Sequence, residues 1–288
     1  MISRIISKVG NPAGRIGDIL VSLCIGTAIC VHPASSSAQT SIPDFSSNAV
    51  GWIAQGVNFQ LPSHGPHQVV NDPGYPFRPP GRGEAPTFRV ADLSNPILLP
   101  WARDELKKRN DRIIGGGTGY TRQVSCWPMG TPAFLLYPAQ PIYFVQTPEQ
   151  VLIISQMDQQ VRHVYLNKFH AENVKPSWYG ESVGHYEGDT LVVDTIGTND
   201  QTWVDNYRTP HSDKLHTIER FRLINDGQTL EVNLHVVDPG AFTMPWNAIQ
   251  RYDRVDQGPL MEFICPENNA HEEIGQIDPM PVAEKPDF

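Results

Sequence analysis

Two histidines and a carboxylate lie close together in one short segment of the sequence. The segment contains His211, Asp213 and His216. An imidazole titrates near neutral pH and a carboxylate can orient it, so this spacing suits proton transfer by a base and its orienting partner. The same side chains could instead hold a metal ion, although the sequence contains neither an HExxH motif nor a CxxC pair. A purely structural or surface role for the histidines is the third possibility.

Glu219 is the fourth candidate catalytic residue. It alternates with Thr217 and Phe221 on one face of an expected strand, and that face is the apolar one. A buried carboxyl group is more easily kept protonated, as a general acid requires. The alternative is an ion pair with Arg162 or Arg251 across the fold. Asp194 invites the same argument, because Val192 and Ile196 flank it on its face of an expected strand.

Candidate ligand-binding residues lie at expected strand ends and loops, with one exception on a strand. The tryptophans are Trp178, Trp203 and Trp246, and the strand residue is Arg162. A tryptophan ring at the mouth of a cavity offers apolar area and one N–H donor, although tryptophans filling a barrel core would fit equally well. Arg162 and Tyr165 are expected on opposite faces of one strand, so only one of them can point inward.

The residues 180–184 fit the G-x-S-x-G pattern of a serine hydrolase. That mechanism needs a strand before the serine and a helix after it, so that the hydroxyl stands on a sharp turn. Here a hairpin and another strand are expected to follow. The pattern therefore favours a glycine-flanked strand over a nucleophile.

The chain from residue 142 onward consists of short β-type runs separated by turn residues. Strands are predicted at 142–146, 151–157, 161–167, 182–186, 190–196, 216–224, 229–237, 246–255 and 260–264. The run 229–237 alternates apolar and polar residues, and 187–189 and 225–227 are good hairpin turns. Eight or nine successive strands without helices predict an all-β, antiparallel barrel, because closure removes the exposed edges. A two-sheet sandwich is the alternative.

Residues 39–125 are expected to wrap the barrel rather than form a core of their own. The part from 39 to 100 contains ten prolines and should be extended and irregular. One short helix is predicted from Pro100 to Arg112, with proline in its first turn. The barrel domain is expected over 126–270, followed by a tail at 271–288.

Residues 1–38 have the pattern of an export signal. Arg4, Lys8 and Arg15 precede an apolar run, and Ala38 ends an A-x-A-like cleavage site. Cleavage would place the protein in the periplasm or outside the cell, without a membrane span. The formal net charge of −9 for the whole chain offers no basic footprint, so we expect no nucleic-acid partner. Only Cys126 and Cys265 would remain, and in an exported chain they would most simply form a disulfide.

Several long motifs resemble those of a family of exported bacterial proteins that are mostly hypothetical. They are PSWYGESVGHYEGDTLVVDT at 176–195, GTNDQTW at 197–203, PHSDKLHTIER at 210–220 and CPENN at 265–269. The run EGDTL also resembles hairpins of lipocalin-like, or calycin, barrels. The resemblance implies a secreted lipocalin-like β-barrel with Cys126 paired to Cys265, and it brings no established activity.

Two functions are compatible with these features. The first is an exported barrel enzyme that acts on a small, largely apolar molecule by His/carboxylate proton transfer, as a lyase, isomerase or hydrolase, without an organic cofactor. The second is a non-catalytic barrel that binds or carries a small hydrophobic ligand. A structural protein of the cell envelope is a third, less favoured reading. The oligomeric state is not predicted.

Overall fold

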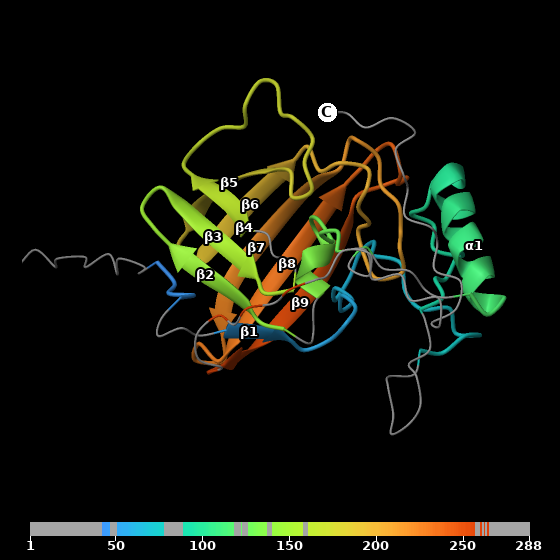
Figure 1. Cartoon of the computed structure of the whole chain (residues 1–288), viewed down its shortest axis with the longest axis horizontal. Helices are drawn as coiled ribbons and strands as arrows, with labels where there is room; N and C mark the ends of the chain where they lie inside the picture. The colour runs from blue at the N-terminus through green and yellow to red at the C-terminus, as the bar shows by residue number, and fades with distance from the viewer. Residues whose placement is uncertain are drawn as a thin grey trace, which may run out of the picture. The chain divides into compact units, whose positions relative to one another are not determined.

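The barrel is closed and mostly antiparallel. The computed structural model describes residues 42–46, 51–77, 89–117, 122, 126–136, 140–157, 161–256, 260, 262 and 264. Nine strands follow one another around the barrel in chain order (Figure 1). They are β1 (Gly51–Ala54), β2 (Ile142–Gln146), β3 (Gln150–Ser155), β4 (Val161–Leu166), β5 (Glu181–Glu187), β6 (Thr190–Ile196), β7 (His216–Ile224), β8 (Thr229–Val237) and β9 (Trp246–Val255). The expected all-β barrel is confirmed.

One neighbouring pair departs from the antiparallel pattern. β4 and β5 run parallel, with Val164 opposite Ser182 and Leu166 opposite Gly184. Parallel neighbours need a crossover, which here is formed by residues 167–180. β4 is paired along its whole length with β3, whereas only its second half pairs with β5. The barrel wall is therefore incompletely hydrogen-bonded beside Val161, Arg162 and His163.

The barrel is closed by a strand that the sequence did not reveal. β1 pairs with β9 from Gly51 to Ala54 and meets β2 at Trp52. It lies in the segment expected to be an irregular wrap, so the barrel extends beyond the predicted boundaries of 126–270. The described residues 260, 262 and 264, where a last strand was predicted, are not in a strand. β1 was missed because it is only four residues long, which is too short for an alternating pattern to be recognised in the sequence.

The barrel interior is filled by side chains that alternate along the strands. The inward series on β8 is Leu230, Val232, Leu234 and Val236, and all four are buried. The 3-10 helix η3 (Ala133–Leu136) adds buried apolar residues, and its Leu135 carbonyl accepts hydrogen bonds from Gln250 and Tyr252 of β9. The interior is thus a packed core that includes a few polar groups.

The helix α1 (Pro100–Ile114) lies beside the barrel and is two residues longer than predicted (Figure 1). Its buried residues are Ala102, Leu106 and Asn110. The Asn110 amide exchanges two hydrogen bonds with the Ala91 backbone, which ties the proline-rich segment to the helix. No helix in the described ranges is long and apolar enough to cross a bilayer.

Some predictions concern residues outside these ranges. The export signal at 1–38 and the tail at 271–288 belong to this group. Cys265 does too, so the disulfide with Cys126 stays a prediction.

Candidate functional site

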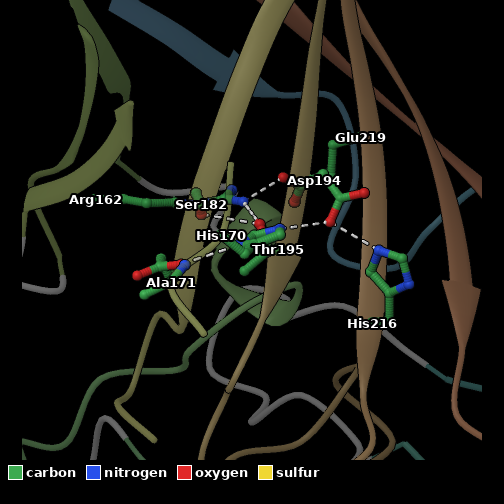
Figure 2. Close-up of polar contacts among 9 residues, drawn as sticks. Arg162, His170, Ala171, Ser182, Asp194, Thr195, His216 and Glu219 are labelled. Carbon is green, nitrogen blue, oxygen red and sulfur yellow. Dashed lines mark hydrogen bonds and ion pairs between the residues drawn. The ribbon is translucent and has the colours of Figure 1, made fainter. Parts of the chain in front are cut away.

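A buried ion pair crosses the barrel interior between β4 and β7. The Arg162 Nη2 atom lies 2.5 Å from Glu219 Oε2, and both side chains are almost completely buried. The same nitrogen donates to Thr195 Oγ1 at 2.7 Å, and Arg162 Nε donates to Ser182 Oγ at 3.1 Å. Figure 2 shows these four side chains, which come from four different strands. The sequence had offered this ion pair as the alternative to a catalytic Glu219.

Burial makes this network costly unless its polar atoms are satisfied. The Arg162 guanidinium is covered by the Phe134 ring at 4.9 Å, which supplies a cation–π contact. However, Arg162 Nη1 and Glu219 Oε1 are buried and have no hydrogen-bond partner among the described residues. One donor and one acceptor of the same ion pair thus keep capacity for a further polar group.

A groove lies on the outside of the barrel beside this network, whose side chains stay buried. Its volume is about 550 Å³, and Arg162 and Ser182 are among its lining residues. The others are Val161, His163, Tyr165, Asn173, Val174, Lys175, Ser177, Trp178, Tyr179, Gly180 and Glu181. It lies where the first half of β4 has no β5 partner, between that strand and the crossover. The incomplete pairing leaves this part of the barrel wall uncovered by a neighbouring strand.

Gly180 allows the crossover to enter β5 beside the groove. Its φ of +67° is left-handed, and a Cβ atom there would lie 2.5 Å from the Ile196 carbonyl oxygen. Gly184 is also confined, because a Cβ there would lie 2.9 Å from the Val192 carbonyl oxygen. Both glycines of the G-x-S-x-G pattern thus have backbone roles. Ser182 stands within a strand and bonds to Arg162 and Thr195, as expected for a strand residue rather than a nucleophile.

A second polar cluster fastens the crossover to the outer face of the barrel. The imidazole of His170 has Nδ1 at 3.1 Å from Glu181 Oε1 and Nε2 at 2.9 Å from Asp194 Oδ1. The His216 Nε2 atom lies 2.8 Å from the same Asp194 oxygen (Figure 2). Glu181 also accepts the Ala171 N–H at 2.8 Å and lines the groove. We call His170, Glu181, Asp194 and His216 the outer histidine cluster.

The electrostatics of this cluster favour charged partners. The pKa of His216 is raised, mainly by its hydrogen bond to Asp194. Burial alone would raise the pKa of Asp194, but the hydrogen bonds from His216 and His170 outweigh it and the pKa is lowered. Carboxylate oxygens only accept, so His170 satisfies both of its contacts when both ring nitrogens carry protons.

His211 lies apart from this cluster and is held as a structural residue. Its Nδ1 contacts the Ser212 carbonyl at 2.8 Å, and its Nε2 lies 2.7 Å from Thr202 Oγ1. Burial lowers its pKa, which favours a neutral ring that donates to Ser212 and accepts from Thr202. Both nitrogens are thereby occupied. Asp213 is exposed and makes no hydrogen bond or ion pair within the described ranges.

The four predicted catalytic residues therefore do not form one site. Thr217, Glu219 and Phe221 face the barrel interior, whereas His216 is half-exposed on the outer face of the same strand. The predicted facing of this strand is confirmed. Side chains on opposite faces of a strand cannot converge on one substrate. Among the described residues, no group of three or more His, Cys, Asp or Glu side chains is arranged to hold a metal ion.

The predicted ligand-binding residues separate into two groups. Arg162 and Trp178 line the groove together. Trp246 is buried in the core against Phe242, and Trp203 is buried under the guanidinium groups of two arginines. Tyr165 is 46% exposed while Arg162 is buried, so the predicted opposition of these two side chains is confirmed.

Sequence reasoning missed the polar partners that complete the site. Ser182 and Thr195 face inward beside Arg162, and the alternation of their strands was the available signal. His170 was not identified, because its partners lie 11 and 24 residues away in the chain. Comparison with known proteins adds no assignment, since no family model and no curated protein matches this chain.

Proposed function

We propose that this protein binds a small molecule in the groove between β4 and the crossover. The observation that carries the proposal is the groove of about 550 Å³, whose lining combines the rings of Tyr165 and Trp178 with the polar side chains of Asn173 and Lys175. A concave site with a few convergent polar groups at its base is the usual form of a small-molecule site. This is the binding-barrel function, with the ligand at the wall rather than in the centre of the barrel.

The lining residues indicate the chemistry of the ligand. Val161, Tyr165 and Trp178 offer apolar and aromatic surface, suited to a flat or hydrophobic body. Asn173 and Lys175 are exposed in the same lining and offer hydrogen-bond donors, suited to a carbonyl, hydroxyl or carboxylate oxygen. The ligand class is therefore a small amphipathic molecule with one polar end.

We also propose that the protein acts in the periplasm or outside the cell. The support is the charged, apolar and small-residue pattern of residues 1–38. Intact mass measurement of the mature protein tests this, with an expected N-terminus at Gln39. A non-reduced sample is expected to weigh two hydrogens less than a reduced one if Cys126 and Cys265 are paired.

Fragment screening by ¹H–¹⁵N NMR tests the groove directly. Amphipathic fragments are expected to shift the signals of Gly180, Ser182 and the Trp178 indole. Trp178→Ala should weaken their binding about tenfold, because an aromatic contact of this kind is worth roughly 1–2 kcal/mol. Phe169→Ala is the matched control, since Phe169 belongs to the same crossover but is 98% exposed and does not line the groove.

Other outcomes would contradict the proposal. Fragments that shift only residues of a second groove, over the outer face of β7, β8 and β9, would place binding elsewhere. That groove has a volume of about 390 Å³ and is lined in part by Pro62, His64, Arg220 and His235. Equal weakening by Trp178→Ala and Phe169→Ala would show that the crossover, rather than the groove, is being perturbed.

Proton-transfer catalysis is the second candidate, and one contact favours it. His216 and Asp194 form a partly exposed imidazole–carboxylate pair of the kind used by general bases. A fragment that binds can be followed for chemical change by NMR. Conversion by the wild type, lost in His216→Gln while binding persists, would indicate an enzyme; binding without conversion would indicate a carrier.

A further inference from the structure

A group of buried and partly buried arginines lies where the segment after β6 meets α1. Arg208 is 5% exposed, and its Nη2 donates to the Arg89 carbonyl at 2.7 Å. Arg109 of α1 donates through Nη1 to the Arg208 carbonyl. The Arg109 guanidinium also lies 5.3 Å from the centre of the Trp203 ring. The guanidinium groups of Arg109 and Arg208 therefore donate to backbone carbonyls rather than to carboxylates, and that of Arg89 lies over the Phe77 ring at 4.5 Å.

One buried carboxylate, that of Asp205, lies among the arginines, and its oxygens accept hydrogen bonds from its own turn. Asp205 accepts hydrogen bonds from the Tyr207 N–H at 2.9 Å and the Thr209 N–H at 3.0 Å. Its other oxygen accepts the Thr209 hydroxyl at 2.8 Å. Asp205 attracts the arginines only at longer range. Glu105 also attracts Arg109 and Arg122 repels it, so the arginines here outnumber the carboxylates.

The arginines retain unused donors and repel one another. The Nε atoms of Arg89 and Arg208 are buried and have no hydrogen-bond partner in the part of the chain that the structure describes. Burial, with further contributions from neighbouring arginines, lowers the pKa of both Arg109 and Arg208 to about 10. A buried excess of positive charge is costly unless an anion compensates it.

We propose that Arg89, Arg109 and Arg208 form a binding site for a small oxyanion. Guanidinium groups bind phosphate, sulfate and carboxylate oxygens through paired N–H donors, and the strength of these bonds increases away from water. The anion would supply the missing negative charge and the missing acceptors together. This site shares no residue with the groove, so it stands or falls independently of the proposed function.

Thermal unfolding in inorganic phosphate, at constant ionic strength set with sodium chloride, tests the site. Phosphate is expected to raise the melting temperature saturably, as ligands of the folded state do. Calorimetry should then give a dissociation constant that rises about tenfold in Arg109→Gln, because one charge-assisted hydrogen bond is lost. Arg220→Gln is the control, since Arg220 is exposed and paired with Glu187.

Further experiments identify the chemical class of the oxyanion and show whether the rise in melting temperature is specific to this site. Titration with glycerol 2-phosphate and with acetate distinguishes a phosphate ester and a carboxylate from free phosphate. Arg208→Gln tests the same site but replaces a buried side chain. If it does not fold, Arg109→Gln serves as the test, because Arg109 is only partly buried on α1. A phosphate response that chloride reproduces, or that Arg109→Gln and Arg220→Gln change equally, would overturn the proposal. The proposal would also be overturned if the arginine variants had lower melting temperatures but the same rise in melting temperature on adding phosphate.

Discussion

The outer histidine cluster binds the crossover to β6 and β7 through charges that water can reach. Asp194 is the centre of the cluster, because one of its oxygens contacts both His170 and His216. The raised pKa of His216 means that its contribution to stability is full below its unfolded value and is lost as the pH rises through the folded value. The lowered pKa of Asp194 has the opposite sense: its contribution is lost as the pH falls through the folded value.

Asp194→Asn is therefore expected to lower the free energy of unfolding most between about pH 4 and 6.5, where the imidazole and the carboxylate are both charged. The loss should be no more than about 1 kcal/mol, because the partners are partly exposed and water screens them. This loss of unfolding free energy should become smaller as the pH rises toward 9, because the imidazole of His216 then loses its charge. Urea unfolding at pH 5.5 and 9 measures the difference. Asp213→Asn, at an exposed carboxylate without these partners, is the control, and a pH-independent loss in Asp194→Asn would refute the electrostatic account.

Among the elements, the junction between the crossover and β5 is closely confined. Gly180 and Gly227 both have left-handed φ angles, +67° and +78° respectively. They differ in surroundings: a Cβ at Gly180 would meet the Ile196 carbonyl oxygen at 2.5 Å, while nothing lies within 4 Å at Gly227. Replacing each glycine by alanine therefore distinguishes the cost of the left-handed backbone, common to both sites, from the cost of close packing at Gly180.

Gly227→Ala is expected to cost about 1–2 kcal/mol of unfolding free energy, the usual penalty for a left-handed alanine. Gly180→Ala should cost roughly 1–3 kcal/mol more, because the added methyl group displaces β6 backbone. Urea unfolding of both variants measures this difference. Equal losses would show that the Gly180 junction yields easily, and the groove beside it would then be more plastic than its geometry implies.

At the scale of the whole molecule, the Arg162–Glu219 ion pair joins distant parts of the barrel wall. It links β4 to β7 through the interior, and the Phe134 ring of η3 covers the guanidinium. Breaking such a pair leaves an uncompensated charge in the core, whereas replacing both partners by apolar residues removes the charges together.

Arg162→Met and Glu219→Leu are each expected to cost about 3–5 kcal/mol of unfolding free energy. The double variant should cost clearly less than the sum of the two. A double-mutant cycle in urea measures the coupling, and the exposed Arg220–Glu187 pair provides a control expected to give at most about 1 kcal/mol. Additive losses at Arg162 and Glu219 would show that the two charges are not coupled.

The sequence by itself indicated most of the strands and the apolar face of two of them. Alternation along 229–237 and 216–224 placed the apolar residues on one side, and the burial of Leu230 and Phe221 agrees. Such local periodicity survives in any fold that buries one face of a sheet. The same reasoning identified Glu219 as buried and Arg162 as a possible partner, which the structure bears out as an ion pair.

Only the tertiary structure decided which of these residues act together. The parallel pairing of β4 with β5 opens the groove, and β1 closes the barrel from a segment that the sequence assigned to the wrap. The separation of His211 from His216, and the meeting of His170 with Asp194, depend on how the crossover lies on the barrel. These contacts join residues far apart in the chain, so no local pattern encodes them. They follow from barrel closure and strand register, which are properties of the folded chain as a whole.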